Sequence, residues 1–289
     1  MKHMTQTIYH VPGIAFLILL AAVHSGCRLT PLVDQELIET QTTAAGFKSS
    51  IIRTRHFDLM VKTRIRQPGN TVVIYIEGDG QAWLSEQRIS SDPTPGNPLA
   101  LKLALQDHRE NVAYIARPCQ YVMHEGRRRN CNNKYWTSHR FSEEVIQAMS
   151  EAVTRVKKES RARSVELVGY SGGGGLAALV AHRRTDIVLL RTVAGNLDHA
   201  TVNRHHGVSP LTGSLNPIDV TLDLCGLCQV HYAGARDEVA PPLIARRFIE
   251  AQGSGQCDQE LIILEQATHW EKWVEIWPSL LARPLFCSN

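Results

Sequence analysis

A serine inside a cluster of glycines is the residue of this chain whose setting points most directly to chemistry. In the stretch VELVGYSGGGGLAALVAH (residues 165–182), an apolar strand-like run ends at Ser171, and a second apolar run follows. Because glycine costs conformational entropy inside regular elements, the cluster predicts a tight turn where a strand and a helix approach closely. Such a turn lifts a serine hydroxyl above the carboxyl edge of a sheet and aims a helix N-terminus at any oxyanion formed there. The alternative is a glycine-rich turn with an incidental serine.

A serine hydroxyl needs a base, and the base needs an orienting carboxylate. Asp237 follows the strand-like run CQVHYAG, and His269 follows QELIILEQ. Both come after predicted parallel strands, whose carboxyl ends are where such sheets place their sites. Asp198, which follows an earlier strand, is the alternative acid. The three residues predict nucleophilic catalysis by Ser171 with His269 as base and Asp237 as its carboxylate.

The elements that would position these residues alternate between strand and helix. Strand-like runs cover residues 56–64, 71–80, 111–118, 164–170, 186–195, 228–234 and 259–266, and helix-like runs cover 142–163, 241–251 and 270–282. In the first of these helices, Val145, Met149, Ala152, Val153 and Val156 fall on one face. This alternation predicts an α/β fold with a mostly parallel central sheet and helices on both faces.

The G-x-S-x-G turn and the order serine, acid, histidine resemble the α/β-hydrolase superfamily over residues 51–289. The resemblance implies that Ser171, Asp237 and His269 are nucleophile, acid and base, and that a water molecule deacylates an acyl-enzyme. About thirty residues separate the strands RTVAG and CQVHYAG, where lids of the family often insert, so we expect at most a small cap.

The resemblance also predicts an oxyanion hole. One donor is the N–H of Gly172, the residue after the nucleophile, and the other lies in YIEGDGQAW. Residues 77–80 stand in the place of the family's His-Gly turn, with a glutamate where histidine is common, so the match assigns the second donor to the Asp79 N–H. The Asp79 carboxylate must then point away from the oxyanion, and Arg117, Arg140 or the following helix is expected to hold it. The alternative for these glycines is a plain tight turn.

The N-terminus has the pattern of a targeting segment. Lys2 supplies a positive charge, and Ile14–Val23 is an apolar run too short to span a bilayer comfortably but suited to a signal peptide. The sequence HSGC resembles a bacterial lipobox, although His24 stands where the pattern prefers an aliphatic residue. We therefore expect a lipoprotein-type signal peptide at residues 1–26 and lipidation of Cys27.

A lipidated Cys27 makes a membrane the expected partner through an N-terminal anchor, with residues 27–50 as a tether. Arg28 follows the cysteine, so by resemblance to enteric sorting rules we expect an outer-membrane lipoprotein facing the periplasm. The alternatives are an ordinary periplasmic or secreted protein and an uncleaved anchor. The net charge of +3 is spread along the chain and gives no nucleic-acid footprint.

Export predicts disulfides among the six cysteines that follow Cys27. Cys119 and Cys131 enclose a short loop beside the expected site, and we predict that they are bridged.

The pairing of the other four cysteines stays open at the level of sequence. Cys257 precedes one strand and Cys225 or Cys228 precedes its expected neighbour, which favours a second bridge between them, while Cys287 has no assignable partner. Cys225 and Cys228 form a CxxC, and a thiol oxidoreductase is the alternative. A redox CxxC opens a helix, whereas this one precedes a strand, which favours a structural role.

The sequence thus predicts an exported serine hydrolase acting on a small carboxylic ester or related acyl compound, without metal or other cofactor, since no ligand-spaced cluster is present. An acyltransferase on the same triad and a non-catalytic envelope protein on a hydrolase scaffold are the alternatives. Trp270, Trp273 and Trp277 recur at helical spacing, which favours packing over a ligand platform.

Overall fold

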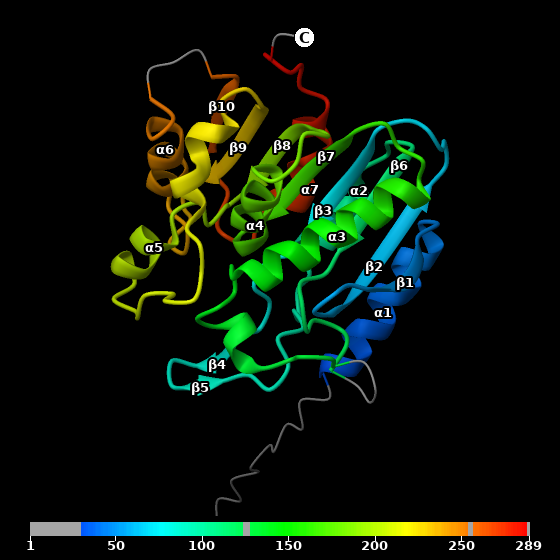
Figure 1. Ribbon diagram of the computed structural model, residues 1–289, viewed down its shortest axis with the longest axis horizontal. Coiled ribbons are helices and arrows are strands. Elements are labelled where there is room, and N and C mark those ends of the chain that lie inside the picture. Colours follow the sequence, from blue (N-terminus) through cyan, green and yellow to red (C-terminus); the bar gives the residue numbers. More distant parts are fainter. Residues whose placement is uncertain (1–29, 124–127, 254–256, 288–289) are drawn as a thin grey trace, which may run out of the picture.

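An eight-stranded sheet forms the centre of the computed structural model, which describes residues 30–123, 128–253 and 257–287 (Figure 1). In spatial order its strands are β1 (Lys48–Arg53), β2 (Asp58–Ile65), β6 (Asn111–Ile115), β3 (Val72–Ile76), β7 (Val165–Tyr170), β8 (Ile187–Val193), β9 (Cys228–Gly234) and β10 (Gln259–Leu264). From β6 to β10 all neighbours are parallel, whereas β2 runs antiparallel to both β1 and β6.

Helices cover both faces of the sheet. They are α1 (Thr30–Ala44), α2 (Leu99–Gln106), α3 (Glu143–Glu159), α4 (Gly172–Ala181), α5 (His199–His205), α6 (Pro242–Glu250) and α7 (Trp273–Leu281), with 3-10 turns η1 (Asn133–Trp136) and η2 (Pro217–Leu224). One apolar cluster joins α3, α4 and α6 to the sheet, and a second joins α2 and α7 to it. A small hairpin, β4 (Trp83–Ser85) with β5 (Arg88–Ile89), stands apart from the main sheet. The predicted α/β architecture is confirmed.

Burial explains why the strand-like runs are continuously apolar. Every residue of β3, β6 and β7 is buried, because helices pack on both faces and leave no position for a solvent-facing side chain. The predicted apolar face of α3 is buried as well. Among the described residues, no helix has the length and hydropathy needed to cross a membrane.

The segment predicted as a tether is largely helical, so the boundary at residue 51 is wrong. Helix α1 packs along the edge of the sheet, where Thr42 is buried and Glu39 accepts hydrogen bonds from Ser49 and Lys62. Strand β1 starts at Lys48 and belongs to the same sheet. Only a narrow side of α1 contacts the sheet. Few positions of the helix therefore need an apolar residue, and the apolar residues of its sequence do not recur clearly at helical spacing. The predicted signal peptide and Cys27 lie outside the described residues.

Three disulfides join the six cysteines. The structure contains the Cys119–Cys131 bridge that the sequence predicts, with the two Cα atoms 5.5 Å apart.

The CxxC cysteines belong to two different bridges, Cys225–Cys257 and Cys228–Cys287. Because they are not paired with one another, they form no dithiol couple, and the thiol-oxidoreductase alternative is wrong. Cys287 ties the end of the chain to the start of β9.

Removing the Cys119–Cys131 bridge by a double Cys→Ala change should lower the free energy of unfolding by about 3 kcal/mol, as expected for releasing a short closed loop. Urea denaturation followed by circular dichroism measures the change. The comparison is the double variant at Cys228 and Cys287, which opens a loop with a sequence separation of 59 in place of 12. An unchanged urea midpoint for the first variant would contradict a stabilising role.

Candidate active site

Ser171 occupies a strained turn between β7 and α4. Its φ and ψ are 51° and −121°, a region that residues other than glycine seldom adopt. The Ser171 N–H donates to the Val193 carbonyl at 2.9 Å, and the Ser171 carbonyl accepts from Gly174 and Asn196, each at 2.9 Å. Backbone hydrogen bonds from both sides therefore hold the turn in a conformation that it would not adopt alone.

Two glycines of the cluster are required by close approach. A Cβ at Gly169 would overlap the backbone of Gly173, where α4 turns back over the end of β7. A Cβ at Gly172 would overlap the Asp79 carboxylate and the Arg117 guanidinium. The start of α4 thus lies directly against the loop that follows β3. Glycines surround Ser171 because a larger side chain at these positions would prevent this contact.

The structure brings the three predicted catalytic residues into one chain of hydrogen bonds. His269 Nε2 lies 3.0 Å from Ser171 Oγ, and His269 Nδ1 lies 2.8 Å from Asp237 Oδ2. The other Asp237 oxygen accepts the N–H groups of Val239 and Ala240, each at 2.8 Å. Since the Asp237 carboxylate accepts the Nδ1 proton, Nε2 is left to accept from the serine. Both Asp237 and His269 are buried.

Asp198, the alternative acid, serves a different purpose. It caps α5 by accepting the Thr201 N–H at 3.2 Å, and it also binds Asn216 Nδ2 and Arg247 Nε, each at 3.0 Å. Burial raises the pKa of Asp198, but hydrogen bonds from Asn216, Thr201 and Arg247 outweigh it and bring the pKa to about 2. Its carboxylate is occupied by these partners, so the acid that orients His269 is Asp237.

The loop that carries His269 is held from two sides. The Tyr170 hydroxyl, next to the nucleophile in sequence, donates to the His269 carbonyl at 3.1 Å. The indole N–H of Trp273 donates to the Thr268 carbonyl at 2.8 Å. The loop of His269 is therefore tied both to the end of β7, which precedes Ser171, and to helix α7.

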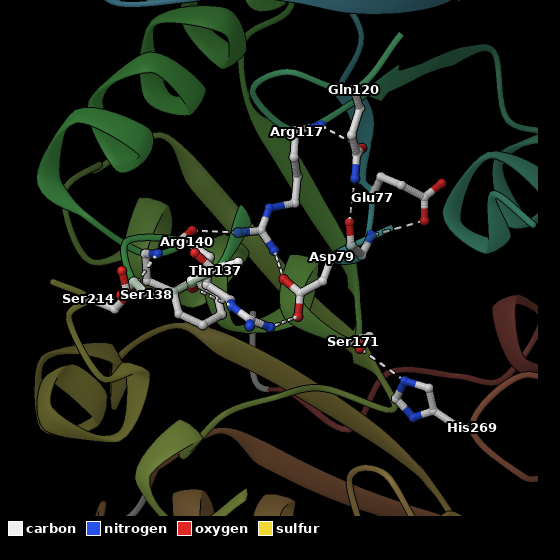
Figure 2. Close-up of polar contacts among 12 residues, drawn as sticks. Glu77, Asp79, Arg117, Gln120, Thr137, Ser138, Arg140, Ser171, Ser214 and His269 are labelled. Carbon is white, nitrogen blue, oxygen red and sulfur yellow. Dashed lines mark hydrogen bonds and ion pairs between the residues drawn. The ribbon is translucent and has the colours of Figure 1, made fainter. Parts of the chain in front are cut away.

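The loop after β3 presents a free backbone donor. Gln120 Nε2 donates to the Gly78 carbonyl at 2.9 Å, and the Gly78 N–H donates to Glu77 Oε1 at 2.9 Å (Figure 2). A trans peptide is planar, so the Asp79 N–H points opposite to the Gly78 carbonyl, away from Gln120. Within the described residues neither this N–H nor that of Gly172, the first residue of α4, has a protein acceptor.

Gln120 is the residue of this site that sequence reasoning did not find. It is buried, and its Oε1 accepts the Arg117 N–H at 3.0 Å while its amide nitrogen holds Gly78. It thereby couples the segment after β6 to the segment after β3. Its place directly after Cys119 was the only sequence signal, and that signal does not reveal what its side chain binds.

Both arginines expected near Asp79 bind its carboxylate. Arg117 Nη1 donates to one oxygen, and Arg140 Nη1 donates to the other at 2.7 Å (Figure 2). Burial alone would raise the pKa of Asp79, but the charges of Arg140 and Arg117 outweigh it and hold the pKa below its usual range. The carboxylate is thus ionised and bound on the arginine side, which leaves the Asp79 backbone as the group available to an oxyanion.

Glu77 is a buried carboxyl group that forms no ion pair with any of the residues that the structure describes. Its Oε1 accepts the N–H groups of Gly78 and Ala100, at 2.9 and 3.3 Å. Burial raises the pKa of Glu77 to about 7, although these hydrogen bonds oppose the shift. The Glu77 side chain thus holds the loop by binding these two N–H groups. Below neutral pH its carboxyl group is largely protonated.

A cavity of about 450 Å³ opens at Ser171 and His269 and is bordered by the loop after β3. Trp83 and Trp270 line it and are 43% and 57% exposed. The expectation that the three tryptophans near the C-terminus pack inside holds for Trp273 and Trp277 but is wrong for Trp270, which lies before α7 begins. Among described residues, no group of three His, Cys, Asp or Glu side chains is arranged to hold a metal ion.

Comparisons with known proteins place the fold. No protein-family model matches the chain, and no curated protein matches it. Among solved structures, it resembles the Pyrococcus furiosus esterase Pf2001 at 14% identity and a TM-score of 0.58, over 83% of this chain and 92% of that one.

Two further solved structures show the same likeness. An alpha-beta serine hydrolase homologue from Coxiella burnetii is 15% identical, with a TM-score of 0.54 over 81% of this chain and 97% of that one. A 2,6-dihydroxy-pseudo-oxynicotine hydrolase is 16% identical, with a TM-score of 0.56 over 86% and 72% of the two chains. The chain has the α/β-hydrolase fold, as the sequence predicts.

Replacing Glu77 by Gln should change how stability depends on pH. The folded state raises the pKa of Glu77 from 4.5 to about 7, so it retains a proton that the unfolded chain releases. The wild-type free energy of unfolding should therefore fall by about 3 kcal/mol relative to Glu77→Gln as pH rises from 4.5 to 7. Urea denaturation of both proteins across this range isolates the effect, because all other groups titrate in both. Parallel profiles would contradict the assignment.

Proposed function

We propose that this protein is a serine hydrolase that cleaves a carboxylic ester or related acyl compound through an acyl-enzyme. The observation that carries the proposal is the chain of hydrogen bonds from Ser171 through His269 to Asp237, at a strained turn beside two unpartnered backbone N–H groups. The α/β-hydrolase fold supports the same reaction class.

Each group has a defined part in the reaction. His269 Nε2 accepts the hydroxyl proton as Ser171 Oγ attacks the acyl carbon, and Asp237 stabilises the resulting imidazolium. The N–H groups of Gly172 and Asp79 bind the tetrahedral oxyanion. His269 then protonates the leaving alcohol as the acyl–oxygen bond breaks. Water, deprotonated by the same histidine, releases the acid and restores Ser171. An alcohol or amine in place of water would give the acyltransferase alternative.

The proposed place of this reaction is the cell envelope, with the chain anchored by lipid on Cys27 at the outer membrane and facing the periplasm. The apolar run before SGC is the basis of the proposal. The three disulfides agree with an oxidising compartment, where such bridges persist, and do not by themselves favour the envelope.

Labelling by a fluorophosphonate tests the nucleophile without knowledge of the substrate. We expect Ser171→Ala to abolish labelling and His269→Ala to nearly abolish it. Asp237→Asn should slow labelling by up to about 10⁴-fold, because the imidazole then favours the wrong tautomer. Asp198→Asn is the matched control: it keeps an oxygen that can cap α5 but loses the charge that pairs with Arg247, and it should label within a few-fold of wild type. A folded wild-type protein that does not label would instead support the non-catalytic alternative.

Gln120→Leu should slow labelling by about 10²-fold, because the peptide that presents the Asp79 N–H loses the bond that fixes its direction. The control is Gln229→Leu, a second buried glutamine, which lies in β9 next to the edge strand β10 and binds the Leu224 carbonyl. Both variants lose a buried hydrogen bond. If the role of Gln120 were purely structural, both variants would have lower thermal stability, and their folded forms would label at the same rate. Equal rates would remove Gln120 from the positioning of the hole.

A further inference from the structure

Exposed apolar side chains gather on the β4–β5 hairpin at the mouth of the cavity. Trp83, Leu84 and Ile89 are all at least one third exposed, and Trp83 lines the cavity. Trp270, more than half exposed, lines it as well. Single exposed apolar residues are ordinary on a protein surface, but several of them around one opening indicate a surface that meets something apolar.

Helix α1 begins at the same end of the molecule. Strand β1 is antiparallel to β2, and β2 is antiparallel to β6, so β1 runs in the same direction as the parallel strands. It starts level with the middle of β6, because Lys48 pairs with Thr63 and Thr63 pairs with Ala113. Helix α1 ends at Ala44, just before Lys48, and the contacts of Glu39 show that it runs back beside β1. A helix of this length covers about 22 Å, enough to reach the carboxyl edge. Figure 1 shows the start of α1 and the β4–β5 hairpin at its lower end.

The distance from Cys27 to α1 is short. Two residues lie between Cys27 and Thr30, and the three peptide units that join them span at most about 11 Å. A lipid on Cys27 would therefore hold the start of α1 near the lipid headgroups. The hairpin and the mouth of the cavity lie at the end of the molecule that this anchor brings closest to the bilayer.

We propose that the β4–β5 hairpin rests on the phospholipid bilayer that holds the anchor, and that Ser171 receives an amphiphilic ester from that surface. The proposal rests on the lipid anchor and the esterase chemistry proposed above. Tryptophan suits this position because its ring is apolar while its N–H remains in the headgroup region. The cavity lining includes the acidic residues Glu77 and Asp79 on the side of the loop after β3, and the acyl chain is placed between Trp83 and Trp270.

Two fluorogenic esters with one leaving group test the proposal. The full chain, purified with its lipid and reconstituted into phosphatidylethanolamine–phosphatidylglycerol vesicles, is given 4-methylumbelliferyl acetate in solution or the oleate within the bilayer. The double variant Leu84→Ser with Ile89→Ser should hydrolyse the oleate about tenfold more slowly and the acetate at the wild-type rate, because neither residue lines the cavity. Leu222→Ser, an exposed leucine of η2, is the matched control and should leave both rates unchanged.

Tryptophan quenching by lipids brominated in their acyl chains provides a readout that does not depend on activity. We expect quenching of the wild-type protein and a clear loss of quenching in Trp83→Phe. If the double variant hydrolyses both esters like wild type and quenching does not depend on Trp83, the orientation is wrong while the esterase stands. If no ester is cleaved and Ser171 does not label, but Trp83 is quenched, the orientation is supported and the enzyme proposal fails. A Cys27 that mass spectrometry finds unacylated would overturn the orientation.

Discussion

The close approach of α4 to the loop after β3 is the constraint on which the site depends. A Cβ at Gly172 or Gly173 would overlap groups of that loop, including the Asp79 carboxylate and the Glu77 carbonyl. Because glycines at these two positions permit the contact, the N–H of Gly172 and the N–H of Asp79 both lie near Ser171. The strained backbone of Ser171 is the local consequence, and it persists because surrounding backbone bonds fix it.

Two acidic residues at this contact have opposite protonation behaviour, and their surroundings explain it. Asp79 lies between two guanidinium groups and stays ionised, whereas burial raises the pKa of Glu77 to about 7 against hydrogen bonds from the N–H groups of Gly78 and Ala100. Arg117 and Arg140 together exceed the charge of Asp79 by one positive unit. For the proposed oxyanion donors, the N–H groups of Gly172 and Asp79, this positive excess would favour the negative charge of a tetrahedral intermediate.

The sequence reveals the elements whose apolar residues follow a clear pattern and the residues that come in a fixed order along the chain. The buried strands are continuously apolar, and Ser171, Asp237 and His269 follow three of them in turn, so both the fold and the candidate triad could be predicted. Helix α1 was missed because only a narrow side of it touches the sheet edge. Gln120 was missed because its importance lies in two backbone groups that it binds, and a sequence does not show which backbone groups a side chain reaches.

The segments that line the cavity explain why its mouth exposes the apolar side chains of Trp83 and Trp270. Residues 196–227, where a cap was considered, form α5 and η2, and η2 packs against α4 and α6. None of these residues lines the described cavity. Its outer wall comes instead from the segment between β3 and α2, which includes Trp83, and from Trp270 before α7. Without a cap to cover them, these tryptophans stay exposed unless something outside the chain covers them, and a bilayer held by a nearby anchor would do so.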